Sequence, residues 1–213
     1  MKRRTLDLVF SIGGLLLAAL VLVLGLVLQN QANFAHNYVK NQLTEQQITF
    51  TPVAGLTAQE KQAQCLISNA GKLMTTGKQA ECYANRYIGL HVTEINNGLT
   101  YSQTSTAARA LQAKATAAQQ SGAANAADLQ SQYEALEAKA TTLFQGETLR
   151  GLLLTSYGFS IFGDRAQTAA WVCYAVALVL FVAGVLGLVH AFSPAGEEQV
   201  FGSSKEQRGP SAV

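Results

Sequence analysis

Two long apolar runs dominate the pattern of hydrophobic and polar positions along the chain. Leu8–Leu28 contains no charged residue, and Thr168–Phe192 is also uncharged and somewhat longer. Because a helix rises about 1.5 Å per residue, either run can cross the roughly 30 Å of a bilayer's hydrocarbon core. The pattern therefore predicts two transmembrane helices, over residues 8–28 and 168–192.

The first run has a second interpretation, as the apolar part of a cleaved signal peptide, because Lys2, Arg3 and Arg4 precede it. It is longer than the roughly 7 to 15 apolar residues of such a signal, and the following LQNQANFAHN offers no clean cleavage site. We therefore expect an uncleaved anchor. Lys and Arg accumulate in short cytoplasmic flanks, so we expect a two-pass protein of the plasma (inner) membrane with both termini cytoplasmic.

The region between the runs, residues 29–167, is then expected to be an extracytoplasmic helical domain, which makes the chain an all-α membrane protein. Residues 1–7 form the cytoplasmic N-terminus, and the polar, Gly- and Ser-rich tail 193–213 is predicted to be disordered. The first helix is expected to continue to about Leu43. An extended connector follows, because Ile48 and Phe50 alternate with polar residues and Pro52 disfavours helix before it.

Capping residues and glycines divide the rest of this domain into helices. Thr57 and Glu60 form a capping-box pattern, which predicts a helix to about Ala70. A second helix is expected from Lys78 to about Asn97. The Ala-rich stretch after Gly98 should be helical, with a break at Ser121–Gly122.

Two of the three cysteines fall in the region expected outside the cytoplasm, where disulfides persist. Cys65 and Cys82 are equidistant from the linker 71–77, so an antiparallel helical hairpin would bring them together. We predict a Cys65–Cys82 disulfide, the alternative being two unpaired thiols. Cys173 lies within the second apolar run, where we expect it to act as a small hydrophobic residue.

From Leu129 the apolar positions recur in alternating steps of four and three, at Leu129, Tyr133, Leu136, Ala140 and Leu143. This spacing predicts a seam that packs against another helix. If the helix continues through Gly146, the same seam includes Glu147 and Arg150. Residues 149–163 are too short for a third span, and we interpret them as an interfacial segment or an extension of the second span.

The second helix of the domain also carries polar residues on its apolar half, namely His91 and Glu94. Buried polar groups need partners, so we hypothesise a buried polar network of His91, Glu94, Glu147 and Arg150. In the alternative, Gly146 breaks the helix and all four residues are ordinary hydrated groups.

Charge and motif content exclude several function classes. Residues 29–167 hold ten basic and nine acidic residues, which gives no reason to propose nucleic acid as a partner. The three histidines, His36, His91 and His190, are too far apart for two of them to share a metal site. No CxxC, GxSxG or phosphate-binding glycine loop is present, so we expect no metal, no cofactor and no enzymatic activity.

The stretches YANRYIGLHVTEINNGLTYSQTSTAA and LFQGETLRGLLLTSYGF resemble an uncharacterised family of two-span membrane proteins, common in actinobacteria and some related soil bacteria. The resemblance covers most of the chain. It implies an N-terminal anchor, a connector ending near ITFTP and a second span after the Gly-rich segment. Some members carry the label aromatic ring-opening dioxygenase, which this sequence does not support because the iron ligands are missing.

These features predict an accessory or scaffold subunit of a membrane assembly that acts through its extracytoplasmic helical domain. Its expected partners are the lipid bilayer and either another membrane protein or further copies of the chain. The alternative is an extracytoplasmic ligand sensor. Because the cytoplasmic tail is too short for a signalling domain, such a sensor would have to signal through a partner protein.

Overall fold

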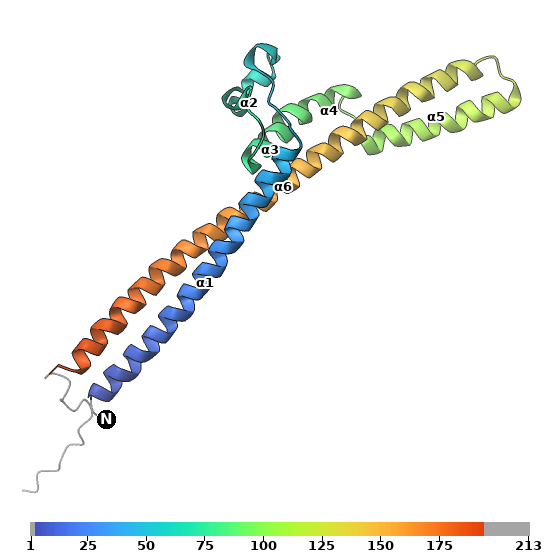
Figure 1. The fold of residues 1–213 in the computed structure, drawn as a ribbon. Coiled ribbons are helices and arrows are strands. Elements are labelled where there is room, and N and C mark those ends of the chain that lie inside the picture. Colours follow the sequence, from blue (N-terminus) through green and yellow to red (C-terminus); the bar gives the residue numbers. More distant parts are fainter. Residues whose placement is uncertain (1–2, 194–213) are drawn as a thin grey trace, which may run out of the picture. The chain divides into compact units, whose positions relative to one another are not determined.

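The computed structural model describes residues 3–193, and all the secondary-structure elements named within this range are helices (Figure 1). The predicted all-α class is therefore confirmed. The six α-helices are α1 (Arg3–Glu45), α2 (Gln64–Asn69), α3 (Gly77–Tyr83), α4 (Gly89–Ile95), α5 (Tyr101–Ser121) and α6 (Ala126–Ala191). The tail predicted to be disordered lies, apart from Ser193, outside the described residues.

The chain forms two compact units. One, the helix-pair unit, combines the chain up to Asn33 with the chain from Asp164 onward. The other, the middle unit, is Phe34–Gly163. Helices α1 and α6 contribute residues to both units, whereas α2 to α5 belong to the middle unit.

Within the helix-pair unit, α1 and α6 lie side by side because small residues let their backbones approach (Figure 1). A Cβ atom at Gly184 would lie 2.8 Å from the Leu15 side chain, and one at Gly25 would lie 2.7 Å from the Tyr174 ring. The Tyr174 hydroxyl donates a hydrogen bond to the carbonyl oxygen of Gly25 at 3.2 Å. The contact thus depends on the two glycines.

Many large apolar side chains of the helix-pair unit lie on its surface. Those of Phe10, Leu20, Trp171 and Phe181 are among the many that are exposed, while Ala18 and other small residues are buried. Within the described residues, α1 and α6 are the two helices long and apolar enough to cross a membrane.

Helix α1 ends within the middle unit at Glu45, two residues beyond the predicted Leu43. The connector after α1 is extended as predicted, and Thr49 forms an antiparallel bridge with Leu73. A 3₁₀ turn, Val53–Gly55, follows Pro52. The predicted Thr57 and Glu60 capping contacts are present, since Glu60 Oε2 accepts from Thr57 N at 2.7 Å and Thr57 Oγ1 accepts from Glu60 N at 3.2 Å.

The helix predicted from Thr57 to Ala70 is wrong in its first half. Those capping contacts lie at the start of a short 3₁₀ turn, Glu60–Gln62, and α2 starts only after Ala63. Ala63 is extended, with φ −89° and ψ 98°, so the two helical pieces cannot merge. The local capping pattern was correct, but it did not fix how far the helix extends.

The next helical stretch combines three elements. Helix α3 begins with a capping box between Thr76 and Gln79, continues into the π-helix Ala84–Ile88, and then into α4. The prediction of a helix from Lys78 to about Asn97 is confirmed in extent. Helix α5 begins with a second capping box, at Thr100 and Gln103, and ends at Gly122, whose φ of 67° confirms the predicted break.

Helix α6 runs unbroken through Gly146, so the alternative in which this glycine breaks the helix is wrong. A Cβ atom at Gly146 would lie 2.7 Å from Val92 Cγ2, so the glycine allows α4 to pack closely against α6. Residues 149–163 are likewise part of α6.

The core of the middle unit joins the end of α1, the connector, α2 to α4 and the central part of α6. Its buried members are Val39, Leu43, Phe50, Leu56, Leu66, Met74, Ala80, Cys82, Ala84, Ile88, Val92, Leu143 and Leu153.

Candidate functional site

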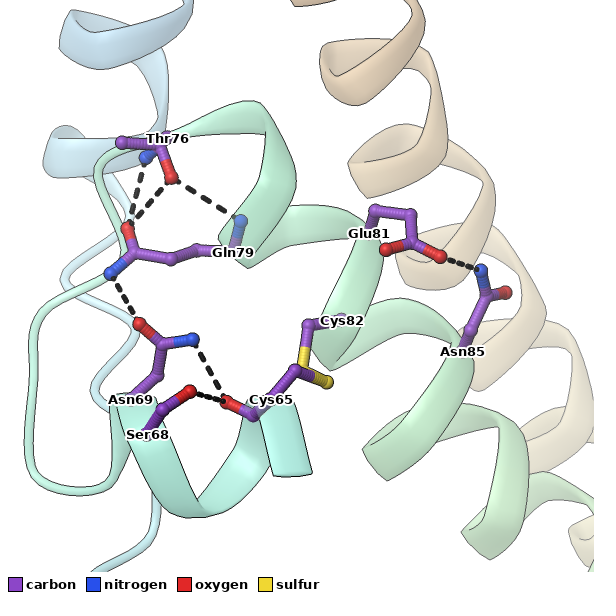
Figure 2. Close-up of a disulfide and its surroundings, with 8 residues drawn as sticks. All are labelled: Cys65, Ser68, Asn69, Thr76, Gln79, Glu81, Cys82 and Asn85. Carbon is purple, nitrogen blue, oxygen red and sulfur yellow. Dashed lines mark hydrogen bonds between the residues drawn. A yellow bond between two sulfur atoms is a disulfide. The ribbon is translucent and has the colours of Figure 1, made fainter. Parts of the chain in front are cut away.

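A disulfide joins α2 to α3 in the middle unit. Cys65 and Cys82 have their Cα atoms 6.1 Å apart, within the range for such bonds (Figure 2). The predicted pairing is therefore confirmed. Cys82 is buried, whereas Cys65 is partly exposed beside a depression of about 430 Å³.

Neutral polar side chains hold the segment 70–76, which links α2 to α3, next to the disulfide. Asn69 Nδ2 donates to the carbonyl oxygen of Cys65 at 2.8 Å, and Gln79 Nε2 donates to Asn69 Oδ1 at 3.1 Å. Gln79 Oε1 accepts from Thr76 N at 3.1 Å (Figure 2). The capping box of α3 is thus connected to the end of α2.

Arg150 links α6 to the π-helix through a chain of polar side chains. Its Nη2 donates to Asn85 Oδ1 at 3.3 Å, and its Nη1 lies 3.3 Å from Glu147 Oε2. Asn85 Nδ2 in turn donates to Glu81 Oε1 at 3.0 Å, as Figure 2 shows. The Arg150 Nε atom is buried and has no acceptor.

The four-residue network predicted from the sequence is wrong as a unit. Glu147 and Arg150 do pair, but both side chains are partly exposed. Glu94 is exposed, and His91 contacts Glu60 rather than Glu147 or Arg150. Arg150 instead finds Asn85, which the sequence interpretation did not consider.

The π-helix Ala84–Ile88 explains why His91 and Glu94 do not face α6. A π turn contains more residues than an α turn, so it rotates every later side chain relative to a wheel drawn with 3.6 residues per turn. The buried positions follow steps of four, at Ala80, Ala84, Ile88, Val92 and Asn96. His91 and Glu94 are thereby turned away from α6.

Glu60 is the most deeply buried ionisable side chain near His91, and no sequence pattern indicates its burial. Its side chain is 4% exposed, against 46% for His91, and His91 Nε2 lies 3.2 Å from Glu60 Oε1. Oε1 accepts no hydrogen bond from any described residue, and the imidazole of His91 lies beside it.

An aromatic stack adjoins this pair. The His91 ring lies 4.5 Å from that of Tyr87, which lies 4.7 Å from Tyr83, which in turn lies 5.3 Å from Phe50. Burial raises the pKa of the Tyr83 hydroxyl above its ordinary value of 10.0, and the neighbouring Tyr87 and Glu60 raise it further. The stack connects the buried connector to the exposed end of α4.

An apolar groove of about 320 Å³ runs between the end of α1 and α6 in the middle unit. We name it the juxtaposed groove. Leu43, Ile48, Leu152 and Phe159 are among its lining residues, none of which is Asp, Glu, Lys or Arg. At one end, the Phe159 ring meets that of Tyr38 at 5.6 Å.

A second groove, of about 300 Å³, lies between α5 and the first part of α6. We name it the hairpin groove. Unlike the juxtaposed groove, it is mixed in character, with Arg109 and Glu137 on its walls and the rings of Tyr101 and Phe144 at one end, 5.4 Å apart.

Within residues 3–193, no group of three or more His, Cys, Asp or Glu side chains is placed to hold a metal ion. What the described side chains form instead is a disulfide-linked helical unit with two grooves. Neither a known protein family, nor a curated protein, nor a solved structure matches the chain.

Proposed function

We propose that the chain is a two-span membrane protein that serves as an accessory or scaffold subunit of a membrane assembly, without catalytic activity. The observation that carries the membrane part is the exposure of large apolar side chains over α1 and α6 in the helix-pair unit. Such surfaces are stable in lipid and unstable in water.

Two further observations support an extracytoplasmic position for the middle unit. The Cys65–Cys82 disulfide lies in that unit, and disulfides persist outside the reducing cytoplasm. The basic cluster Lys2–Arg4 precedes α1's apolar run and favours a cytoplasmic N-terminus. Both observations support the same proposal, a middle unit outside the cytoplasm.

The juxtaposed groove supports the subunit role. It is apolar, contains no Asp, Glu, Lys or Arg, and ends in exposed aromatic rings. Among possible occupants, an uncharged helical segment of another membrane protein fits best, because a charged segment would lose hydration without gaining an ionic partner. We therefore assign the groove to the membrane partner.

The test is a pull-down of the tagged full chain from its native membrane in mild detergent, followed by mass spectrometry. We expect one membrane protein in stoichiometric amount. Leu152→Glu should abolish its recovery, because Leu152 is exposed and lines the groove. Leu99→Glu, equally a Leu-to-Glu change at an exposed site of the middle unit but outside the groove, should leave recovery unchanged.

Recovery of the chain alone would count against the subunit role, and equal recovery with both variants would count against the groove. Topology is tested separately by adding protease to right-side-out membrane vesicles. The middle unit should be cleaved without permeabilisation; cleavage only after permeabilisation would contradict the proposed orientation.

A further inference from the structure

The hairpin groove has an ordered arrangement that the proposed function does not use. Helix α5 ends at Ser121 and α6 begins at Ala126, so residues equally distant from this turn lie at the same level of the hairpin. Arg109 lies level with Glu137, Ser105 with Thr141, and Tyr101 with Phe144. Each level therefore presents one residue from α5 and a different residue from α6.

The two charged side chains on the groove walls, Arg109 and Glu137, form no ion pair with any described residue. Arg109 donates one hydrogen bond, to Thr106 Oγ1 on its own helix at 3.2 Å. Glu137 has no hydrogen bond or ion pair with the described residues, and neither does it pair with Arg109 across the groove. Both side chains are exposed. At the same level the groove thus offers one cation and one anion that have no ionic partner among residues 3–193.

The seam beneath the groove is made of small residues. Ala108, Ala115 and Ala118 of α5 and Ala140 of α6 are buried. Small side chains at this seam allow the two helices to lie close together, so that residues of both helices line the groove.

We propose that the hairpin groove binds the hairpin groove of a second copy of this chain, with a two-fold axis running along the hairpin. This operation places α5 of each copy against α6 of the other, level by level. Arg109 of each copy then meets Glu137 of its partner copy, twice per dimer. The rings of Tyr101 and Phe144 meet in the same way.

Charge complementarity is what selects a second copy over another partner. A two-fold axis exchanges α5 and α6, and the groove carries opposite charges on exactly those two walls. Tyr and Arg are enriched at the centres of protein interfaces, and Tyr101 and Phe144 are 41% and 54% exposed in the single chain. This inference names one partner for the proposed function and rests on it only for the membrane setting.

The test uses the full chain in detergent, with the dimer dissociation constant measured by energy transfer between two differently labelled preparations. Arg109→Glu and Glu137→Arg should each weaken self-association by about tenfold or more, because like charges then face each other. Mixing the two single variants should restore the dimer, since each reversed side chain meets an opposite charge. The double variant should also regain wild-type affinity.

Lys114→Glu and Glu134→Arg are the matched controls, since both reverse exposed charges on the same helices outside the groove. They should leave the dissociation constant within about twofold of wild type. Circular dichroism of every variant checks folding. A monomeric wild-type chain, or single variants that fail to recover on mixing, overturns the proposal.

The pull-down tests the subunit role and the dissociation constant tests the dimer, so either proposal can be contradicted while the other holds. A membrane partner recovered by a monomeric chain would remove the dimer and keep the subunit role. A dimer recovered with no membrane partner would keep the dimer and contradict the subunit role.

Discussion

His91 Nε2 lies 3.2 Å from Glu60 Oε1, so a half-exposed imidazole covers a carboxylate that is almost wholly buried. The other oxygen of the same carboxylate accepts from Thr57 N at 2.7 Å. Glu60 therefore ties the connector to α4 as well as to its own turn. Both contacts lie inside the middle unit, close to its aromatic stack.

Removing the imidazole should leave Oε1 of this buried carboxylate without the polar group that lies beside it. We expect His91→Ala to lower the free energy of unfolding of the middle unit by about 1 to 2 kcal/mol. Glu94→Ala, an exposed site on the same helix, should change it by less than about 0.5 kcal/mol. Hydrogen exchange of the full chain in detergent measures both, and equal effects would contradict the assigned contact.

The raised pKa of Tyr83 predicts a loss of stability at high pH. Because the folded state holds the phenol proton more tightly than the unfolded state, this contribution is fully present below pH 10.0 and is lost as the pH rises through the higher folded pKa. Tyr83→Phe should flatten the fall in unfolding free energy above pH 10.0. Tyrosinate absorbance gives the titration directly.

A fall of the same steepness in the wild type and in Tyr83→Phe would contradict burial of the Tyr83 hydroxyl as its cause.

Loss of the disulfide should destabilise the middle unit. Cys65 and Cys82 are 17 residues apart in sequence, and closing a loop of about this size stabilises by about 3 kcal/mol in the chain-entropy model. We expect Cys65→Ala combined with Cys82→Ala to lose a comparable amount in denaturant unfolding. Cys173→Ala, which removes the free thiol of the helix-pair unit, should lose much less.

At Gly146, we expect alanine to change the stability in the direction opposite to that given by helix propensity. Alanine normally stabilises a helix by about 1 kcal/mol relative to glycine. At Gly146, however, the added Cβ would lie 2.7 Å from Val92 Cγ2, so Gly146→Ala should destabilise by about 1 to 3 kcal/mol. Combining it with Val92→Ala should cost less than the sum of the two single changes.

Gly151 lies on the same helix, and no atom lies within 4 Å of the Cβ it would carry. Gly151→Ala should therefore stabilise the chain by about 0.5 to 1 kcal/mol. Thermal unfolding of the four variants tests the contrast. A stabilising effect at Gly146 equal to that at Gly151 would contradict the close approach of α4 and α6.

The sequence predicted those features that depend on local chemistry. The capping contacts of Thr57 and Glu60, the break at Gly122 and the pairing of Cys65 with Cys82 each follow from residues near in sequence or symmetric about a turn. The helical class and the two long apolar helices follow from composition and period. None of these required knowledge of tertiary contacts.

The sequence did not predict features set by contacts between distant elements. The π-helix at Ala84–Ile88 has no sequence signature, yet it decides which face His91 and Glu94 occupy. The burial of Glu60 depends on α4 folding over the connector. Gly146 could break the helix or lie within it, and only the packing of Val92 against α6 shows why a glycine lies within an unbroken helix.

The disulfide also changes what a cut in the chain does. The segment that links α2 to α3, residues 70–76, lies inside the loop that Cys65 and Cys82 close. A protease that cleaves there leaves the fragments before and after the cut covalently joined. The nicked protein would therefore migrate as an intact chain on a non-reducing gel and separate into two fragments only after reduction.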